Sequence, residues 1–335
     1  MMTRKVRFYR NLKGYYAGSN GGNLKLRDAF DHIDKYSSWD ATIYFSKESE
    51  LSDFAGNYWK GLERRALDSW IIEDGDICFI SGKDWEVLPR KDRLSPPVPI
   101  INIVQPRHIR LDDPRNEYLK HPAIRIAKSK NGAKILKEYG VNGPVYLIPD
   151  AIDLTLLPSV SQFKDIDILI IGLKQPKLAK SLYKELKRWA KRSGKKLKIE
   201  VQLPPKLATR MDFLNLLNRS KMSVCIPLAD EKGGEGFYLP ALEAMALESL
   251  VVTHLAIGNL DHCTDDVNCL ISKGASSQAY MTSIQKAYDL TTDQRNEFIS
   301  NGLQTAKQHE IGKERQKIID LVDRAYDIWA QYFIS

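Results

Sequence analysis

Residues 234–246 have the sequence Gly-Glu-Gly-Phe-Tyr-Leu-Pro-Ala-Leu-Glu-Ala-Met-Ala. A glycine-rich turn leads directly into a run of good helix formers, and two glutamates, Glu235 and Glu243, lie eight residues apart. The first N–H groups of a helix have no partner within it and attract anions such as a diphosphate. An ionised carboxylate accepts hydrogen bonds from neighbouring hydroxyls. Phosphates in the middle and hydroxyls at each end describe a nucleotide sugar, which is the ligand that this stretch predicts.

This stretch resembles the donor-site signature of the retaining glycosyltransferases of family 4, the glycosyl transferases group 1, which have the GT-B fold. The family pattern is Glu-Gly-Phe-Gly-Leu-Pro-x-Leu-Glu-Ala-Met-Ala, followed by a buried Val-Val strand, here Leu-Val-Val-Thr at 250–253. Tyr238 replaces the second glycine, which predicts a narrower sugar pocket. The resemblance implies that Glu243 holds the ribose hydroxyls and Glu235 the sugar hydroxyls. The donor-binding candidates in this stretch are Glu235, Gly236, Phe237, Tyr238, Leu239 and Glu243.

The composition is that of a soluble globular protein of two domains, with 335 residues, 43% of them hydrophobic and 27% charged. No apolar run approaches the roughly 18 residues needed to span a bilayer, and the N-terminus lacks the apolar segment of a signal peptide. The four cysteines form no CxxC pair, which predicts buried reduced thiols and no zinc site. We expect a cytoplasmic protein, free or peripheral at the inner face of the membrane.

The net charge of +8 is concentrated in one segment. Residues 174–198 contain eleven Lys or Arg and one acid, Glu185, while Leu178, Leu182, Leu186 and Trp189 recur at helical spacing. The segment therefore predicts an amphipathic helix with a basic outer face. Three interpretations are open: a solvated surface, the simplest; contact of 177–198 with anionic lipid, which would bring a lipid-linked acceptor close; and nucleic acid. The third lacks interleaved aromatic residues and a binding motif, so we expect no nucleic acid partner.

Strand-like and helix-like segments alternate through both halves of the chain. In the first half we expect strands near 5–9, 41–45, 76–80, 100–104, 123–127 and 145–149, and helices near 24–33 and 131–139. In the second half we expect strands near 166–172, 197–201, 222–227, 250–253 and 268–271, and a helix near 209–219 besides the basic and signature helices. This alternation predicts an α/β protein with parallel, doubly wound sheets.

The resemblance implies the GT-B arrangement, two Rossmann-like domains facing across a cleft. We expect an N-terminal acceptor domain at 1–153, which ends in a segment similar to the family's Ile-Pro-Asn-Gly-Ile-Asp, here Ile-Pro-Asp-Ala-Ile-Asp. A linker follows at 154–164, and then a sugar-nucleotide donor domain at 165–315. The final helix, within 316–335, is expected to cross back to the first domain, as it does in GT-B enzymes.

Further phosphate-binding candidates come from glycine and lysine positions. Gly21 and Gly22 lie between the first strand and the first helix, and they resemble the Gly-Gly loop of family 4, which lies over the donor phosphates or the acceptor. Family 4 places an arginine directly after the glycine that ends the strand at 166–172, but this chain has Leu173. Because transfer without a metal needs a cation for the departing diphosphate, Lys174 and Lys177 are both candidates.

The strand at 100–104 is followed by Gln105, where many family members have a histidine that contacts the sugar, and His108 comes three residues later. Either residue can make this contact, so the catalytic candidates are Glu235, Gln105 and His108. The resemblance implies retaining transfer from a nucleotide-diphosphate sugar to a carbohydrate or lipid-linked acceptor, with no metal and no cofactor. One alternative is another GT-B enzyme, such as a sugar-nucleotide epimerase or a phosphorylase. The other is a non-catalytic sugar-nucleotide-binding subunit, which is compatible with Leu173 and Gln105 in place of the family arginine and histidine.

Overall fold

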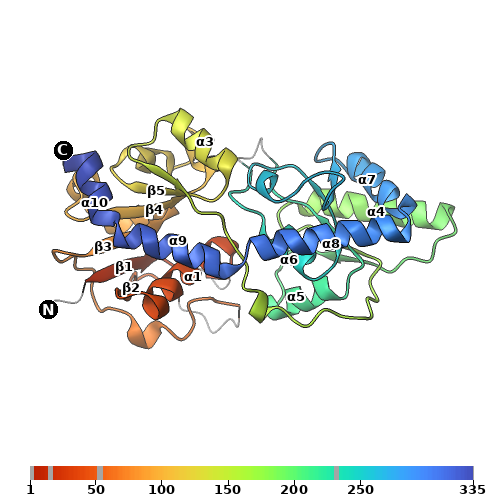
Figure 1. Cartoon of the computed structure of the whole chain (residues 1–335), viewed down its shortest axis with the longest axis horizontal. Helices are drawn as coiled ribbons and strands as arrows, with labels where there is room; N and C mark the ends of the chain where they lie inside the picture. Colours follow the sequence, from red (N-terminus) through yellow and green to blue (C-terminus); the bar gives the residue numbers. More distant parts are fainter. Residues whose placement is uncertain (1–3, 14–17, 51–55, 230–233, 335) are drawn as a thin grey trace. The chain divides into compact units, whose positions relative to one another are not determined.

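The computed structural model describes residues 4–13, 18–50, 56–229 and 234–334, and the chain divides into two compact units (Figure 1). Unit 1 comprises Met1–Asp150 and Gly312–Ser335, and unit 2 comprises Ala151–Ile311. Each unit is built on one parallel sheet, and each is described by itself below.

Unit 1 contains a six-stranded sheet in the order β2-β1-β3-β4-β5-β6, with every neighbouring pair parallel. Its strands are β1 (Lys5–Arg10), β2 (Asp40–Phe45), β3 (Ile77–Ser81), β4 (Ile100–Val104), β5 (Ile124–Ala127) and β6 (Val145–Leu147). Its helices before the last segment are α1 (Gly21–Tyr36), α2 (Arg90–Leu94) and α3 (Lys130–Tyr139), with the 3-10 helices η1 (Glu63–Arg65), η2 (Gly82–Val87), η3 (Pro106–Ile109) and η4 (Asn116–Lys120). The order places β1 between β2 and β3, which is the doubly wound topology that the sequence predicts.

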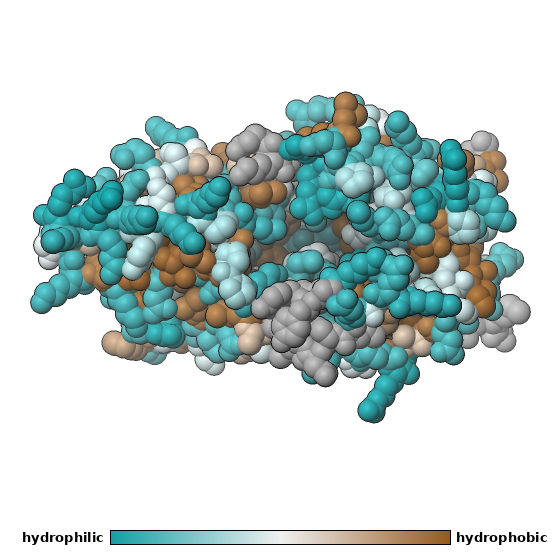
Figure 2. Space-filling view, turned by 180° about the vertical axis from the view of Figure 1, so that it is seen from behind, coloured by the Kyte–Doolittle hydropathy of each residue, from teal (hydrophilic) through white to brown (hydrophobic). Residues whose placement is uncertain are grey.

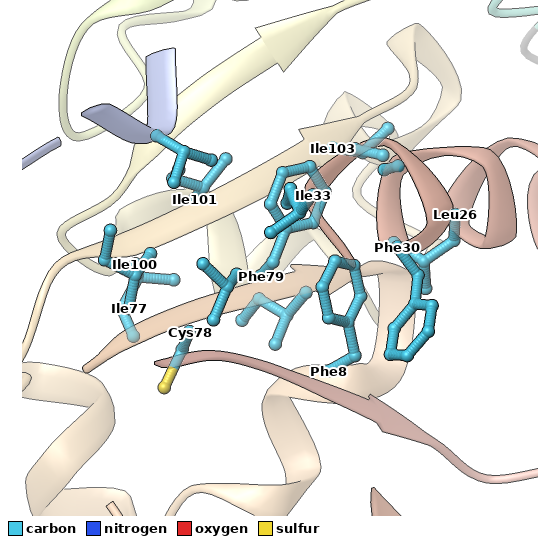
Figure 3. Packing of buried hydrophobic residues seen from close by; sticks show 14 of the residues in the cluster. Phe8, Leu26, Phe30, Ile33, Ile77, Cys78, Phe79, Ile100, Ile101 and Ile103 are labelled. Carbon is cyan, nitrogen blue, oxygen red and sulfur yellow. The ribbon is translucent and has the colours of Figure 1, made fainter. Parts of the chain in front are cut away.

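The core of unit 1 is built from apolar side chains of its central strands and of α1 (Figure 3), while the same strands also bury Arg7, Asn102 and Arg125. Phe8 of β1 stacks on Phe79 of β3 with ring centroids 5.0 Å apart, and its edge meets Phe30 of α1 at 5.3 Å. The C-terminal helices α9 (Ile311–Asp323) and α10 (Ala325–Trp329), followed by the π-helix η8 (Ala330–Ile334), complete this core. Side chains such as Ile318 and Trp329 are buried in it.

A buried group of charges fixes α9 to the rest of unit 1. Lys25 of α1 and Lys128 both contact the carboxylate of Glu314, and Lys128 also pairs with Asp150 at 2.9 Å. Burial alone would lower the pKa of Lys25, but the carboxylates of Glu314 and Asp28 raise it above its ordinary value. Because removing one partner leaves a buried charge uncompensated, each of these pairs is a strong constraint on the packing of α9.

Unit 2 contains a five-stranded parallel sheet in the order β11-β10-β9-β7-β8. The strands are β7 (Ile168–Ile171), β8 (Ile199–Gln202), β9 (Met222–Cys225), β10 (Leu250–His254) and β11 (Leu270–Ser272). The helices are α4 (Pro176–Arg192), α5 (Arg210–Asn218), α6 (Leu239–Ala246), α7 (Ser277–Asp289) and α8 (Thr292–Gln308), with the 3-10 helices η5 (Leu154–Leu156) and η7 (Asn259–Asp261). The wholly apolar β7 is an inner strand of the sheet, between β9 and β8, and all four of its residues are buried, as expected for a parallel strand covered on both faces.

The strand order of unit 2 reverses at β7. The chain runs from β7 through α4 to β8 on one side, and then returns to β9 on the other side of β7. The strands β7 and β9 are neighbours, but the chain leaves β7 toward β8 on one side and leaves β9 toward β10 on the other side. In open α/β sheets, ligands bind at this switch point, outside the carboxyl ends of the strands.

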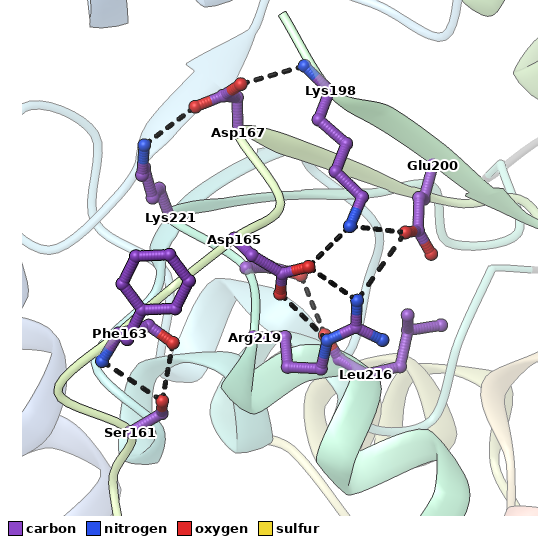
Figure 4. A network of polar contacts seen from close by, with 10 residues as sticks. Ser161, Phe163, Asp165, Asp167, Lys198, Glu200, Leu216, Arg219 and Lys221 are labelled. Atoms are coloured by element: carbon purple, nitrogen blue, oxygen red, sulfur yellow. Dashed lines mark hydrogen bonds and ion pairs between the residues drawn. The ribbon is translucent and has the colours of Figure 1, made fainter.

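Ion pairs join the segments at the amino ends of the unit 2 strands (Figure 4). Arg219 donates two hydrogen bonds to Asp165, at 2.8 and 2.7 Å, and Lys198 pairs with the same carboxylate. Lys221 pairs with Asp167 at 2.8 Å. Nearby, Lys164 donates to the carbonyl oxygens of Asn218 and Leu247, at 2.9 and 2.7 Å, and so satisfies the C-terminal ends of α5 and α6.

Within the described ranges, no helix is long and apolar enough to cross a bilayer. The face of the molecule seen in Figure 2 is mostly hydrophilic, with smaller hydrophobic areas between the polar side chains.

Candidate functional site

Lys174 and Glu235 lie together at the switch point of unit 2. Lys174 follows β7 and Glu235 lies in the segment between β9 and α6, and Lys174 Nζ is 3.7 Å from Glu235 Oε1. The same carboxylate oxygen accepts a hydrogen bond from the backbone N–H of Leu228 at 3.0 Å. Gln175 Nε2 donates to the carbonyl of Pro227 at 2.6 Å and so ties the two segments to each other. The side chain of Lys174 is 49% exposed, so its ammonium group is accessible to a ligand.

Lys177, the other lysine candidate, lies in the first turn of α4 and is exposed. Another cation, Lys206, lies in the segment between β8 and α5 and interacts electrostatically with Lys174. Desolvation and then the charge of Lys174 lower the pKa of Lys206, so the two ammonium groups affect each other. The sequence analysis missed Lys206. Its signal was a lysine directly after Pro204 and Pro205 beyond the carboxyl end of a strand.

Helix α6 begins in the signature stretch, with Tyr238 as its N-cap residue and Pro240 in its first turn. Tyr238 has φ −113° and ψ 85°, a backbone conformation that any residue can adopt, so the family glycine is not required here. The side chain is only 4% exposed. Desolvation raises the pKa of its hydroxyl well above its ordinary value, so Tyr238 is a neutral phenol buried within the signature stretch. Phe237 and Leu239 are likewise buried.

Glu243 lies one turn further along α6 and is 1% exposed. Its carboxylate pairs with Arg210, the first residue of α5, which the sequence analysis also missed. A capping box fixes this helix start: Thr209 Oγ1 accepts from the N–H of Asp212 at 3.0 Å, and Asp212 accepts from the N–H of Thr209 at 2.9 Å. The available signal was the sequence Thr-Arg-Met-Asp, which marks a helix start but does not reveal the partner of its arginine.

The backbone of Glu235 and Gly236 packs directly on Gly258. A Cβ atom at Gly258 would lie 2.4 Å from the carbonyl carbon of Gly236 and 2.6 Å from the carbonyl oxygen of Glu235. Glycine is therefore required here by close approach of two backbone segments. Gly258 therefore helps to set the position of the candidate donor segment.

The side chain of His262 also packs against the candidate donor segment. Its ring stacks on Phe237, with centroids 4.4 Å apart and planes at 28°, and it is 2% exposed. Desolvation, and then the neighbouring His309, lower the pKa of His262 to about 3, so the ring is neutral at physiological pH. A neutral, stacked imidazole fits a positioning role.

Two asparagines brace the segment that carries Gly258 and His262. Asn259 Oδ1 accepts from the N–H of Ala256 at 2.7 Å, and its amide donates to the carbonyl of His254 at 2.8 Å. Asn268 donates to the carbonyl of His262 at 2.9 Å and accepts from the N–H of Thr264 at 2.8 Å. Both asparagines thus have a structural role in holding this turn.

In unit 1, Gly21 and Gly22 are the first two residues of α1, after Asn20, whose side chain accepts from the N–H of Asn23 at 2.9 Å. Both glycines are exposed, and neither has a positive φ. A Cβ atom at Gly21 would meet nothing within 4 Å, so packing in this unit does not require glycine there. The absence of side chains leaves the first turn of α1 open to an anion.

Gln105 and His108 both follow β4, but only Gln105 is accessible. Gln105 is half-buried, whereas His108 is 4% exposed. Burial, with Arg115 and Arg107 nearby, lowers the pKa of His108 to about 3. The N–H of Gln105 lies 3.5 Å from His108 Nδ1, so the histidine contacts the start of its own 3-10 turn, η3.

Two Asp-x-Asp sequences, at 74–76 and 165–167, raise the question of a metal site, since carboxylates two residues apart can bind a divalent cation. The first lies at the amino end of β3 in unit 1, and the second lies at the amino end of β7 in unit 2, opposite the carboxyl ends of the strands where Lys174 and Glu235 lie. Asp76 pairs with Arg7, and Asp165 and Asp167 take part in the ion pairs of Figure 4. Over the described ranges, no group of three or more His, Cys, Asp or Glu is placed to hold a metal ion.

The two sheets and their connections define an α/β protein of the two-domain GT-B fold, which confirms the predicted fold class. Residues 152–305 match the profile of the family Glycosyl transferases group 1, so unit 2 carries a glycosyl transferases group 1 domain. A search of curated proteins by sequence found no match.

Solved structures support the fold over the whole chain. The structure of HepE from Anabaena in complex with UDP and glucose aligns with a TM-score of 0.69 and 15% identity, over 96% of this chain and 99% of that one. Sucrose-phosphate synthase from Thermosynechococcus elongatus aligns with a TM-score of 0.65 and 12% identity, over 97% and 99%. A glycosyltransferase from Rickettsia africae aligns with a TM-score of 0.64 and 11% identity, over 97% and 99%. At these identities the likeness shows the fold alone.

Proposed function

We propose that this protein is a glycosyltransferase that moves a sugar from a nucleoside diphosphate to an acceptor hydroxyl, with retention of configuration and without a metal ion. The observation that carries the proposal is the proximity of Lys174 and Glu235, 3.7 Å apart at the switch point beside the start of α6. This arrangement lies in a domain that matches the glycosyl transferases group 1 profile. UDP is the first nucleotide to test, because HepE, which shares the fold, was solved with it.

In this proposal the diphosphate lies against Lys174 and the N–H groups at the start of α6, where a cation and a helix terminus both favour negative charge. Glu235 accepts hydrogen bonds from the transferred sugar, and Glu243, held by Arg210, accepts them from the ribose. Lys206 adds positive charge near Lys174 and compensates for the family arginine that Leu173 replaces.

The proposed reaction breaks the bond between the anomeric carbon and the diphosphate oxygen, and forms a bond from the acceptor oxygen to the same face of that carbon. The acceptor proton passes to the departing phosphate oxygen, so the products are the glycoside and the protonated nucleoside diphosphate. Lys174 acts mainly on this step, because the charge on the diphosphate grows as the bond breaks. No protein nucleophile is needed. In unit 1, Gln105 is a better candidate for substrate contact than the buried His108.

A second candidate function is that of a non-catalytic sugar-nucleotide-binding subunit. Leu173, in the place of the family arginine, favours it, because binding tolerates the loss of one cation better than catalysis does.

The experiment is to incubate the protein with UDP-glucose and a panel of alkyl glycosides, and to follow UDP release and the anomeric proton signals of any product by NMR. Transfer is expected to give the α-anomer from the α-linked donor and to continue in EDTA. A β-linked product would contradict retention, and loss of transfer in EDTA would contradict metal independence. Binding of UDP-glucose without UDP release on any acceptor would favour the binding subunit.

A further inference from the structure

The outward face of α4 carries a continuous row of cations, here called the basic stripe. Its members are Lys177, Lys180, Lys184, Lys187, Arg188, Lys191 and Arg192, and all are exposed. At 100° per residue these seven positions fall within an arc of about 140°. The arc lies opposite the buried side chains of α4, which are Ala179, Leu182, Leu186 and Ala190. The stripe therefore points directly away from the core of unit 2.

The stripe contains no negative charge. The one acid of α4, Glu185, is only partly exposed and accepts a hydrogen bond from Ser277 Oγ at 2.5 Å. Within the described ranges, no carboxylate forms an ion pair with a member of the stripe. The same unit pairs other surface cations efficiently: Lys198 and Arg219 share Asp165, and Lys221 pairs with Asp167. The contrast marks the stripe as a surface whose charge is left for an external polyanion to compensate.

We propose that the basic stripe is a docking surface for an anionic membrane, through the phosphate groups of its lipids. A helix of 17 residues is about 25 Å long, so the stripe can meet several headgroups at once along one straight line. Attraction to an anionic leaflet increases with each Lys or Arg near the surface and needs no specific geometry. Five of the seven cations are lysines, which act as point charges.

The stripe has no means of inserting into the bilayer. The apolar side of α4 is already buried in unit 2, so the contact is electrostatic and sensitive to salt, unlike that of an amphipathic helix lying in the interface.

A nucleic acid partner fits the stripe less well, because it offers no aromatic ring for base stacking. The two aromatic residues of α4, Tyr183 and Trp189, pack against the core of unit 2. Lys187 lies over the ring of Tyr183 and Lys195 over that of Trp189.

The test is sedimentation of the full chain with vesicles of phosphatidylcholine, alone or with about one-third phosphatidylglycerol. We expect binding to the anionic vesicles only, and loss of that binding when salt is raised from about 0.1 M to about 0.5 M. Equal binding to both kinds of vesicle, or no binding to the anionic ones at low salt, would overturn the proposal.

A pair of matched variants separates the stripe from net charge. The stripe variant is Lys180→Glu, Lys184→Glu, Lys187→Glu and Lys191→Glu together, and it leaves Lys177, a donor-site candidate, intact. The control makes the same change of net charge at exposed lysines elsewhere: Lys91→Glu, Lys273→Glu, Lys307→Glu and Lys317→Glu. We expect the stripe variant to bind anionic vesicles at least about tenfold more weakly, and the control to bind within about twofold of wild type.

Equal loss in both variants would show that net charge, not the stripe, drives binding, and would refute the proposal. Circular dichroism and melting temperature check that each variant is folded. An oligouridylate serves as a competing probe: if the wild type binds it more tightly than the anionic vesicles, and only the stripe variant loses this binding, the partner is a nucleic acid and not a membrane.

Discussion

Charged residues at the two ends of the unit 2 strands are of the same kinds but are paired differently. The amino ends of these strands are called the amino edge here, and the carboxyl ends are called the carboxyl edge. At the amino edge, Asp165, Asp167, Lys198, Arg219 and Lys221 pair with one another (Figure 4). Hydrogen bonds from Arg219 and Lys198 hold the pKa of Asp165 well below its usual value. The charges at this edge are compensated within the protein, and they join neighbouring strand ends.

At the carboxyl edge the charges are less completely matched. Lys174 is 3.7 Å from Glu235, beyond hydrogen-bonding distance, and its other charged neighbour, Lys206, is also a cation. Glu243 has Arg210 as its partner, but it lies in a helix whose first turn offers N–H groups for an anion. The comparison teaches that charge at one edge stabilises the fold, whereas under the proposed function charge at the other edge serves a ligand.

The largest expected effect comes from changing one carboxylate at each edge. Glu235→Gln removes a charge but keeps an oxygen that can accept the N–H of Leu228. We expect kcat/KM to fall at least about 100-fold, or about 2.7 kcal/mol, because the proposed hydrogen bonds to the transferred sugar lose their charge, with nucleotide binding nearly unchanged. Asp165→Asn at the amino edge should lower the melting temperature slightly and leave kcat/KM unchanged.

Steady-state kinetics measure kcat/KM and melting curves measure stability for both variants. If Asp165→Asn lost activity as severely as Glu235→Gln, the division between the two edges would be wrong.

A second test displaces the segment that carries Glu235 by adding a methyl group to the residue that packs against it. Gly258→Ala places a methyl group against the backbone of Gly236 and Glu235, so that segment has to shift. We expect kcat/KM to fall about tenfold or more, since small misplacements of positioning groups are costly. Gly302→Ala is the control, because a Cβ there would meet the flexible side chain of Met245, at 3.1 Å, in the same unit. Equal effects of the two substitutions on activity would argue against a specific support role for Gly258.

A third test uses the protonation of His262. Its pKa is about 3 in the folded protein and about 6.5 when unfolded, so below pH 6.5 the unfolded chain binds a proton that the folded chain does not. Its stabilising contribution is complete above pH 6.5 and is lost as the pH falls toward 3. His262→Phe keeps an aromatic ring against Phe237 without this titration. In urea unfolding, we expect the variant to lose about 1.2 kcal/mol less stability than wild type between pH 6 and pH 5. Parallel stability curves would contradict this assignment.

The smallest effect is expected near the amino edge, at Lys164. Replacing it with methionine removes the hydrogen bonds to the carbonyls of Asn218 and Leu247 while keeping most of the side-chain volume. We expect a loss of about 1–2 kcal/mol in the free energy of unfolding, measured in urea, and no change in donor binding. A stability equal to that of wild type would show that water replaces these bonds at no cost.

Much of the fold was predictable because it follows from local pattern. The apolar run at 166–172 becomes β7 (Ile168–Ile171), and the run at 100–104 becomes β4 (Ile100–Val104). The helix expected near 24–33 is longer, Gly21–Tyr36, because Asn20 caps it and the two glycines form its first turn. The strand expected at 145–149 ends at Leu147.

The candidate site was only partly predictable, because several of its contacts join residues distant in sequence. Nothing in the sequence around Glu243 reveals that Arg210 is its partner, because α5 and α6 come into contact only in the folded protein. The same holds for Lys206 beside Lys174 and for Gly258 against Gly236. Of the two lysine candidates, Lys174 is the one that pairs with Glu235, at 3.7 Å, and sequence spacing alone did not distinguish them.

The most direct test of the central claim is calorimetric titration of UDP into wild type and two matched variants, Lys174→Met and Lys177→Met. If the carboxyl edge is arranged for a nucleoside diphosphate, Lys174→Met should bind UDP about tenfold or more weakly, because a charge-assisted contact to phosphate is lost. Lys177→Met should bind within about twofold of wild type. Equal affinities of all three proteins, or loss only in Lys177→Met, would contradict the account.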